Sequence, residues 1–174
     1  GLPEISYPTD KENWAHCLSL VKRLTIKNNQ LYQEPVPAIK KLRQQQVSLV
    51  GQAQTTQEKI LLKQTANQYE LQLTFAANTQ GTLYLFRDLA QQTGLKIKFD
   101  SGQAAELLVD RTKAGQAFNV ADGQIRRIIL EPHQPLSLDI FVDHSVCEIF
   151  VNHGKSVFSL RVFPQAFANA VSLV

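Results

Sequence analysis

The feature that most constrains this chain is the spacing of its short apolar stretches, which recur about every ten residues with turn-forming residues between them. Residues 69–75 show the pattern most clearly, because Tyr, Leu, Leu and Phe alternate with Glu, Gln and Thr. A period of two places successive side chains on opposite faces of a strand, so one face here is apolar. The rhythm is typical of an antiparallel β-sandwich or β-barrel. The other segments of this kind are 60–62, 82–86, 95–99, 106–109, 126–130, 136–142, 146–151 and 156–163.

The chain before residue 33 carries its own strand pattern. We expect strands at 17–21 and 24–26, and a third at 30–32. Asn tolerates positive φ, so Asn28-Asn29 predicts a two-residue hairpin turn between the last two of these strands.

A linker is predicted at residues 33–43. The Glu-Pro-Val-Pro sequence at 34–37 stops any hydrogen-bonded ladder, and apolar residues three apart then suggest a single helical turn. Only 88–93 offers another helical turn, and Gly94 would suit its C-terminal cap. The expected fold class is therefore all-β.

Composition excludes several classes of function. The chain has 174 residues with 18 Lys+Arg against 15 Asp+Glu, and its net charge of +3 is too small and scattered to indicate nucleic acid binding. No window approaches the ~18 uninterrupted apolar residues of a membrane span. The chain starts at Gly1 without a secretory signal pattern and contains no Met, so we expect a piece of a longer, cytoplasmic protein.

Cysteine and histidine give no sign of a metal or redox centre. Cys17 and Cys147 lie far apart in the sequence and are predicted to be buried free thiols. The four histidines show no ligand spacing and there is no Cys-x-x-Cys pair, so we expect neither a metal nor a cofactor.

Two carboxylates are candidates for a catalytic pair. Asp143 and Glu148 flank one tight connection, and glycosidases use paired carboxylates. A structural interpretation is favoured, because Asp143 closes a strand as a turn former. Glu148 lies inside an apolar strand, where a carboxylate needs a hydrogen-bonded or cationic partner, and Arg161 on the neighbouring strand is the expected one.

Other reactive residues also favour structural roles. Asp110-Arg111 ends a strand and could bind a sugar hydroxyl or a phosphate, but such a step more often pairs internally and shapes a turn. His144 and Ser145 are adjacent in a turn and do not form a catalytic triad. Trp14, the only tryptophan, could stack on a sugar, but packing or an inter-domain contact is preferred.

A longer pattern resembles a known family. Residues 142–154 read Val-Asp-His-Ser-Val-Cys-Glu-Ile-Phe-Val-Asn-His-Gly, with Asn152 near the end, and Arg161 and Pro164 follow. The run resembles the C-terminal part of glycoside hydrolase family 32 (invertases, β-fructofuranosidases and sucrose-6-phosphate hydrolases), whose tails carry a similar Val-Asp-x-Ser-x-x-Glu-x-Phe-x-Asn-x-Gly pattern. Residues 108–112 resemble the family's Asp-Arg strand end. The segments that resemble the end of its catalytic domain and its linker are 1–3, 7–10, Trp14, 18–20, 23–25 and 32–43.

The resemblance implies a division of labour. In such enzymes a five-bladed β-propeller carries catalysis and a C-terminal β-sandwich of the concanavalin-like jelly-roll type follows it. The expected domains are the last propeller strands at 1–32, the linker at 33–43 and the sandwich at 44–174. The family's catalytic motifs do not occur here, so no residue is assigned as catalytic. Asp110, Arg111, Asp143, Glu148, Asn152 and Arg161 are structural members of the motif.

Three functions remain open from the sequence. The first is a non-catalytic accessory domain of an enzyme that cleaves sucrose or sucrose 6-phosphate, with the missing propeller as its partner. The second is a lectin-like carbohydrate-binding module. The third is a pure oligomerisation domain. Under the first hypothesis, severed propeller strands would leave unpaired edges that invite self-association of the fragment. The aromatic residues share parity with the apolar strand faces, which favours core packing over sugar stacking.

Overall fold

The computed structural model describes residues 4–50, 57–63, 67–118 and 123–174, and Gly1, Leu2 and Pro3 of the family resemblance lie outside them. The regular secondary structure of these residues consists of strands, as expected, together with two short 3₁₀-helices. In chain order the elements are η1 (Asp10–Glu12), β1 (Lys22–Lys27), β2 (Gln30–Pro35), η2 (Pro37–Leu42), β3 (Lys59–Lys63), β4 (Gln68–Phe75), β5 (Gln80–Asp88), β6 (Thr93–Asp100), β7 (Glu106–Asp110), β8 (Ile125–Ile129), β9 (Leu136–Asp143), β10 (Val146–Val151), β11 (Ser156–Arg161) and β12 (Ala170–Leu173).

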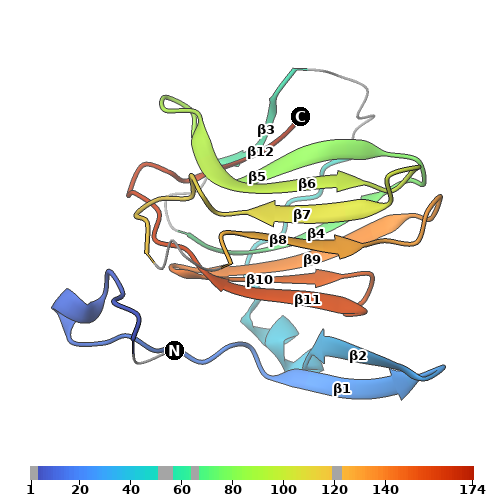
Figure 1. The fold of residues 1–174 in the computed structure, drawn as a ribbon, viewed down its shortest axis with the longest axis horizontal. Helices are drawn as coiled ribbons and strands as arrows, with labels where there is room; N and C mark the ends of the chain where they lie inside the picture. The colour runs from blue at the N-terminus through green and yellow to red at the C-terminus, as the bar shows by residue number, and fades with distance from the viewer. Residues whose placement is uncertain (1–3, 51–56, 64–66, 119–122) are drawn as a thin grey trace.

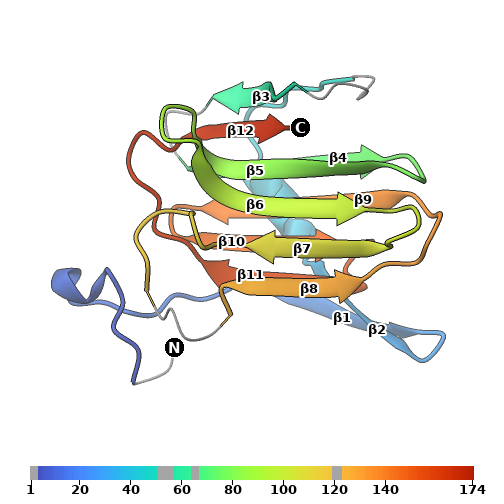
Figure 2. The ribbon, with the colours of Figure 1, turned by 45° about the horizontal axis from the view of Figure 1, so that its top comes forward.

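The strands after the linker form two separate antiparallel sheets that lie face to face (Figure 1). One sheet has the order β11-β10-β9-β4, and the other has the order β3-β12-β5-β6-β7-β8. Figure 2 shows the larger sheet in front of the smaller one, with edge strands β8 and β11 on the same side of the molecule. The fold is therefore the sandwich and not the barrel that the rhythm alone left open.

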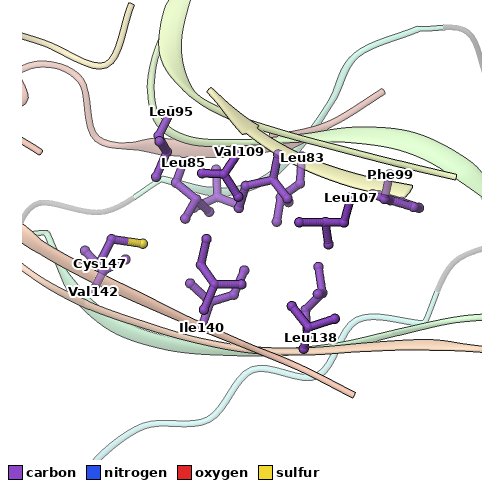
Figure 3. Close-up of a cluster of buried hydrophobic side chains, with 14 of the residues drawn as sticks. Leu83, Leu85, Leu95, Phe99, Leu107, Val109, Leu138, Ile140, Val142 and Cys147 are labelled. Carbon is purple, nitrogen blue, oxygen red and sulfur yellow. The ribbon is translucent and has the colours of Figure 1, made fainter. Parts of the chain in front are cut away.

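The core fills the space between the sheets because the strand alternation is obeyed on both inner faces. In β9, Leu136, Leu138, Ile140 and Val142 are buried, whereas the intervening residues face away from the core. Figure 3 shows Leu138, Ile140 and Val142 of this row opposite leucine side chains of the larger sheet, among them Leu83 and Leu107. Burying each such side chain contributes about 1.5–3 kcal/mol.

The segment before the sandwich contains an independent two-stranded sheet. β1 pairs with β2 through a turn in which Asn28 has a φ of 50° and Asn29 a φ of 60°, so the predicted hairpin is confirmed. The predicted helical turn is also confirmed, because Ile39 and Leu42 lie in η2. Figure 1 places the hairpin beside the four-stranded sheet, on the side away from the core.

The expectation that residues 34–37 stop any ladder was wrong, because β2 pairs with β1 as far as Pro35 and the start of the predicted linker lies in that strand. Three further sequence predictions about elements were wrong. Residues 17–21 are not a strand, because this stretch of backbone is extended without a ladder, and the Leu20 N–H donates instead to the Glu148 carboxylate. Residues 88–93 do not form a helical turn but the connection between β5 and β6. There the Asp88 carboxylate accepts hydrogen bonds from the N–H groups of Ala90 and Gln91, and Gly94 lies within β6.

The third error concerns the C-terminal end. Strand β11 stops at Arg161 and not at residue 163, and β12 was not predicted at all. β12 nevertheless pairs with both β3 and β5 in the middle of the larger sheet. Its fully buried Ser172 interrupts the apolar pattern, and the hydroxyl is satisfied by a hydrogen bond to Glu58.

Candidate functional site: the outer face of the four-stranded sheet

Part of the motif that resembles the family lies on the outer face of the four-stranded sheet, away from the core. Phe150 and Glu148 are each only 1% exposed, although they alternate with the core residues of β10. They are buried because the chain from about Trp14 to Pro35 crosses this face (Figure 1). We call this contact between the N-terminal segment and the outer sheet face the junction.

Glu148 is the polar centre of the junction. Its carboxylate accepts hydrogen bonds from the Leu20 N–H at 2.5 Å, from Lys22 Nζ at 2.6 Å and from Ser159 Oγ at 2.7 Å. The prediction that Arg161 is the partner of Glu148 was wrong. In the strand register Glu148 stands opposite Ser159, whereas Arg161 stands opposite Val146, so the cation comes from β1. These three donors meet the need of a buried carboxylate for hydrogen-bonded and cationic partners.

Lys22 also touches the apolar part of the junction. Its ammonium lies 5.9 Å from the centre of the Phe150 ring, and that ring packs edge-to-face against Phe141 with centroids 5.8 Å apart. Sequence reasoning did not single out Lys22, because a partner more than a hundred positions away leaves no local pattern.

Arg161 is a second anchor of the junction. Its guanidinium donates to the Ala15 carbonyl at 3.1 Å and to Ser145 Oγ at 3.0 Å. It also lies among aromatic rings, 5.3 Å from the centre of Trp14 and 5.8 Å from that of Tyr7. Trp14 therefore makes a contact between segments, as predicted, while 41% of the residue remains exposed.

The turn between β10 and β11 makes a third contact. Gln33 N–H of β2 donates to the Gly154 carbonyl at 2.9 Å. Gly154 has a φ of 80°, and a Cβ placed there would lie 2.0 Å from the Gln33 carbonyl oxygen, so only glycine fits. Asn152 supports the turn because its side-chain oxygen accepts the Ser137 N–H.

The linker is held by an arginine–carboxylate pair that the sequence did not reveal. Arg43, just after η2, donates through Nε to Glu70 of β4 at 2.7 Å and through Nη2 to the other carboxylate oxygen. Asp139 lies on the same sheet face, and burial raises the pKa of its carboxyl above the usual value, partly offset by His153.

The remaining motif residues shape turns. The side chain of Asp143 is 75% exposed, and its carboxylate binds His144 and Gln68, whereas Glu148 is committed to the junction. Asp110 accepts hydrogen bonds from the N–H and hydroxyl of Thr112. Arg111 donates to the carbonyls of Phe118 and Gly123. Asp143 and Glu148 thus have separate partners.

Cysteine burial was half correct. Cys147 is buried in the core, whereas Cys17 is exposed because the stretch around it is not a strand. Among the described residues no group of three or more His, Cys, Asp or Glu side chains is arranged to hold a metal ion. No helix in the same residues is long and apolar enough to cross a membrane.

Comparisons with known proteins agree with this geometry. Residues 38–174 match the family described as "Glycosyl hydrolases family 32 C terminal". The sucrose-6-phosphate hydrolase of Pediococcus pentosaceus is 38% identical over 166 residues, which cover 95% of this chain and 32% of that protein. The sucrose-6-phosphate hydrolase of Streptococcus mutans is also 38% identical, over 94% of this chain and 32% of its own length.

A solved structure gives the same result. The sucrose-6-phosphate hydrolase of Lactobacillus gasseri superposes with a TM-score of 0.87 at 42% identity, covering 99% of this chain and 34% of that chain. The chain therefore spans about a third of the length of the curated relatives it matches.

Proposed function

The chain belongs to glycosyl hydrolase family 32, and on that premise we propose that it serves as the non-catalytic C-terminal part of an enzyme that hydrolyses sucrose 6-phosphate or sucrose. Its role is to support the catalytic domain that occupies the rest of such a protein. The observation that carries this proposal is the junction, where the sandwich commits buried charged groups to the segment before it.

We also propose domain limits at 1–32, 33–43 and 44–174. The hairpin β1–β2 forms a sheet of its own, and η2 and Arg43 lie between it and the sandwich. Leu24 and Ile26 of the hairpin are 61% and 76% exposed, which is unusual for a strand pair with an apolar face. We propose that the preceding propeller domain of the same polypeptide covers them.

The accessory role is favoured over a sugar-binding module. A module would present aromatic platforms on one face, but Phe75 and Phe99 are buried and stack on each other in the core with centroids 4.3 Å apart. Tyr69 likewise packs against the core. Isothermal titration of the chain with sucrose and with a fructan tests this. No heat of binding is expected, and a dissociation constant of about 1 mM or tighter would favour the module.

The catalytic part of the proposal has a direct assay. The 174-residue chain is expected to release no fructose from sucrose or from sucrose 6-phosphate, because the family's catalytic motifs do not occur in it and Glu148 is committed to Lys22. Release of fructose at a rate typical of a whole enzyme would overturn the assignment. The assay is paired with a circular dichroism spectrum, which shows that the tested chain is folded.

Two finer assignments complete the proposal. We place the protein in the cytoplasm, and the two free thiols support this because secreted domains usually pair their cysteines. We also expect the isolated chain to self-associate through the exposed side chains of Leu24, Ile26 and Leu31. Sedimentation velocity tests this expectation, and a strictly monomeric chain at about 0.1 mM would contradict it.

A further inference from the structure

A cleft is lined by residues from edge strands β8 and β11 and from the loops near them. The two strands lie on the same side of the sandwich (Figure 2). Its volume is about 530 Å³, which is within the range of small-molecule sites. Its described lining comprises Tyr7, Val109, Arg111, Phe118, Gly123, Gln124, Arg126, Arg127, Val157, Phe158, Ser159, Leu160 and Arg161. The cleft adjoins the junction, because Tyr7, Ser159 and Arg161 border both.

The charge of this lining is one-sided. Four of the seven arginines of the chain line the cleft, and its described lining contains no Asp or Glu. Outside the cleft, Arg23, Arg43 and Arg87 each pair closely with a glutamate. Arginine is the side chain best suited to bind phosphate, through its planar fork of donors.

Arg126 is the arginine best placed to receive a ligand. It stands opposite the core residue Val109 in the strand register, so its side chain belongs to the inner face of the larger sheet. The guanidinium lies over Gly123, where an added Cβ would be 2.2 Å from Nη2. Within residues 4–50, 57–63, 67–118 and 123–174, Arg126 makes no ion pair.

The other arginines surround Arg126 with positive charge. Arg127 Nη1 lies 3.8 Å from Glu106 Oε2, and the Arg127 side chain is 63% exposed. Arg161 donates to the Ala15 carbonyl and to Ser145 Oγ, and these neutral partners leave its positive charge in place. Burial, followed by the nearby charge of Arg126, lowers the pKa of Arg111, as expected where positive charge is concentrated.

An inward-facing charge on an edge strand also protects a sheet against pairing with another chain. That role would account for Arg126 by itself. It would not account for a hollow that gathers three further arginines, excludes carboxylates from its described lining and has an apolar wall at Val109, Phe158 and Leu160. The apolar wall matches the organic part of a ligand, and the arginines match its anionic head.

We propose that this cleft binds a small phosphate monoester, with the phosphate at Arg126 and the organic group against Phe158 and Leu160. This site lies outside the catalytic chemistry and does not depend on the proposed function. The cleft volume fits a molecule of the size of a sugar phosphate.

The test is a titration of the ¹⁵N-labelled 174-residue chain with glucose 6-phosphate, inorganic phosphate and glucose, followed by amide chemical shifts. Glucose 6-phosphate is expected to bind with a dissociation constant of about 1 mM or tighter, at least about threefold tighter than inorganic phosphate. Glucose is expected not to bind. The shifts should map to the amides of Val109, Arg126 and Leu160.

Arg126→Gln should weaken glucose 6-phosphate binding about tenfold, because the charged group that donates hydrogen bonds to the phosphate is lost. The position is exposed, so the substitution should leave the fold intact. The matched control is Arg23→Gln, which removes the same charge from the hairpin and should leave binding unchanged. Equal weakening by both variants, equal binding of inorganic phosphate, shifts that map elsewhere, or no binding at about 10 mM would each overturn the proposal.

Discussion

Replacement of Glu148 by alanine is the sharpest test of the junction. The carboxylate is 1% exposed and joins two donors of the N-terminal segment, Leu20 N–H and Lys22 Nζ, to the hydroxyl of Ser159. Removing it leaves three donors without their acceptor. The nearest remaining contact of the Lys22 ammonium is Ser159 Oγ at 3.5 Å.

The expected cost follows from burial. Removing one partner of a buried ion pair lowers the free energy of unfolding by about 3–5 kcal/mol. The Lys22 side chain is 16% exposed and can reach water in part, which places the value for Glu148→Ala at the lower end, about 3 kcal/mol. Glu148→Gln keeps the shape and one acceptor oxygen but loses the charge, and should cost about half as much.

The assay uses two probes of urea unfolding. Trp14 is the only tryptophan and lies in the junction against Arg161, so its fluorescence reports the docking of the N-terminal segment. Far-UV circular dichroism reports mainly the sandwich strands. The Trp14 transition should move to lower urea by more than the circular dichroism transition, because two of the three lost bonds reach the N-terminal segment.

A double-mutant cycle with Lys22→Met isolates the ion pair. The two substitutions should be strongly non-additive, since each alone leaves the other charge buried. A cost below about 0.5 kcal/mol for Glu148→Ala, or additive single costs, would refute the assignment of Glu148 as the centre of the junction.

Further predictions concern single positions. Gly154→Ala should destabilise the chain by about 1–3 kcal/mol, because the new Cβ would meet the Gln33 carbonyl at a positive φ. Gly102→Ala, whose nearest Cβ neighbour is the Asp100 carboxylate oxygen at 3.2 Å, should cost far less, and thermal unfolding compares the two. A thiol reagent should modify Cys17 in the folded chain and Cys147 only after unfolding, since burial raises the pKa of the Cys147 thiol; equal rates would contradict the fold. The Arg87 guanidinium lowers the pKa of Glu58, so the stability from this pair is present at neutral pH and should be lost as the pH falls below about 4.5. In Glu58→Gln, the free energy of unfolding should fall less steeply over that acidic range. Burial raises the pKa of Asp139, so its charge opposes folding at neutral pH, and Asp139→Asn should stabilise the chain at pH 7 but not at pH 3; a destabilised variant at pH 7 would contradict this sign.

Local patterns determined the elements that local physics controls. The alternation at 69–75 specified β4 and its apolar face, because a period of two leaves only one face to bury. Asn28-Asn29 specified the hairpin, because both residues tolerate the left-handed backbone of that turn. The same reasoning predicted a helix at 88–93 and failed, since Asp88 caps a turn between paired strands.

Long-range pairing decided the rest. No local pattern identifies Lys22 as the partner of Glu148, since only the docking of β1 onto β10 brings them together, and Arg161 is directed elsewhere by a register offset of two residues. β12 is a central strand because it pairs with β3 and β5, although Ser172 breaks its apolar run. The cleft with Arg126 also arises only where two sheet edges meet. The sequence by itself thus determined most of the strands and the family that they resemble, because these depend on near neighbours. The tertiary structure alone decided which charges meet, because that depends on segments that are distant along the chain.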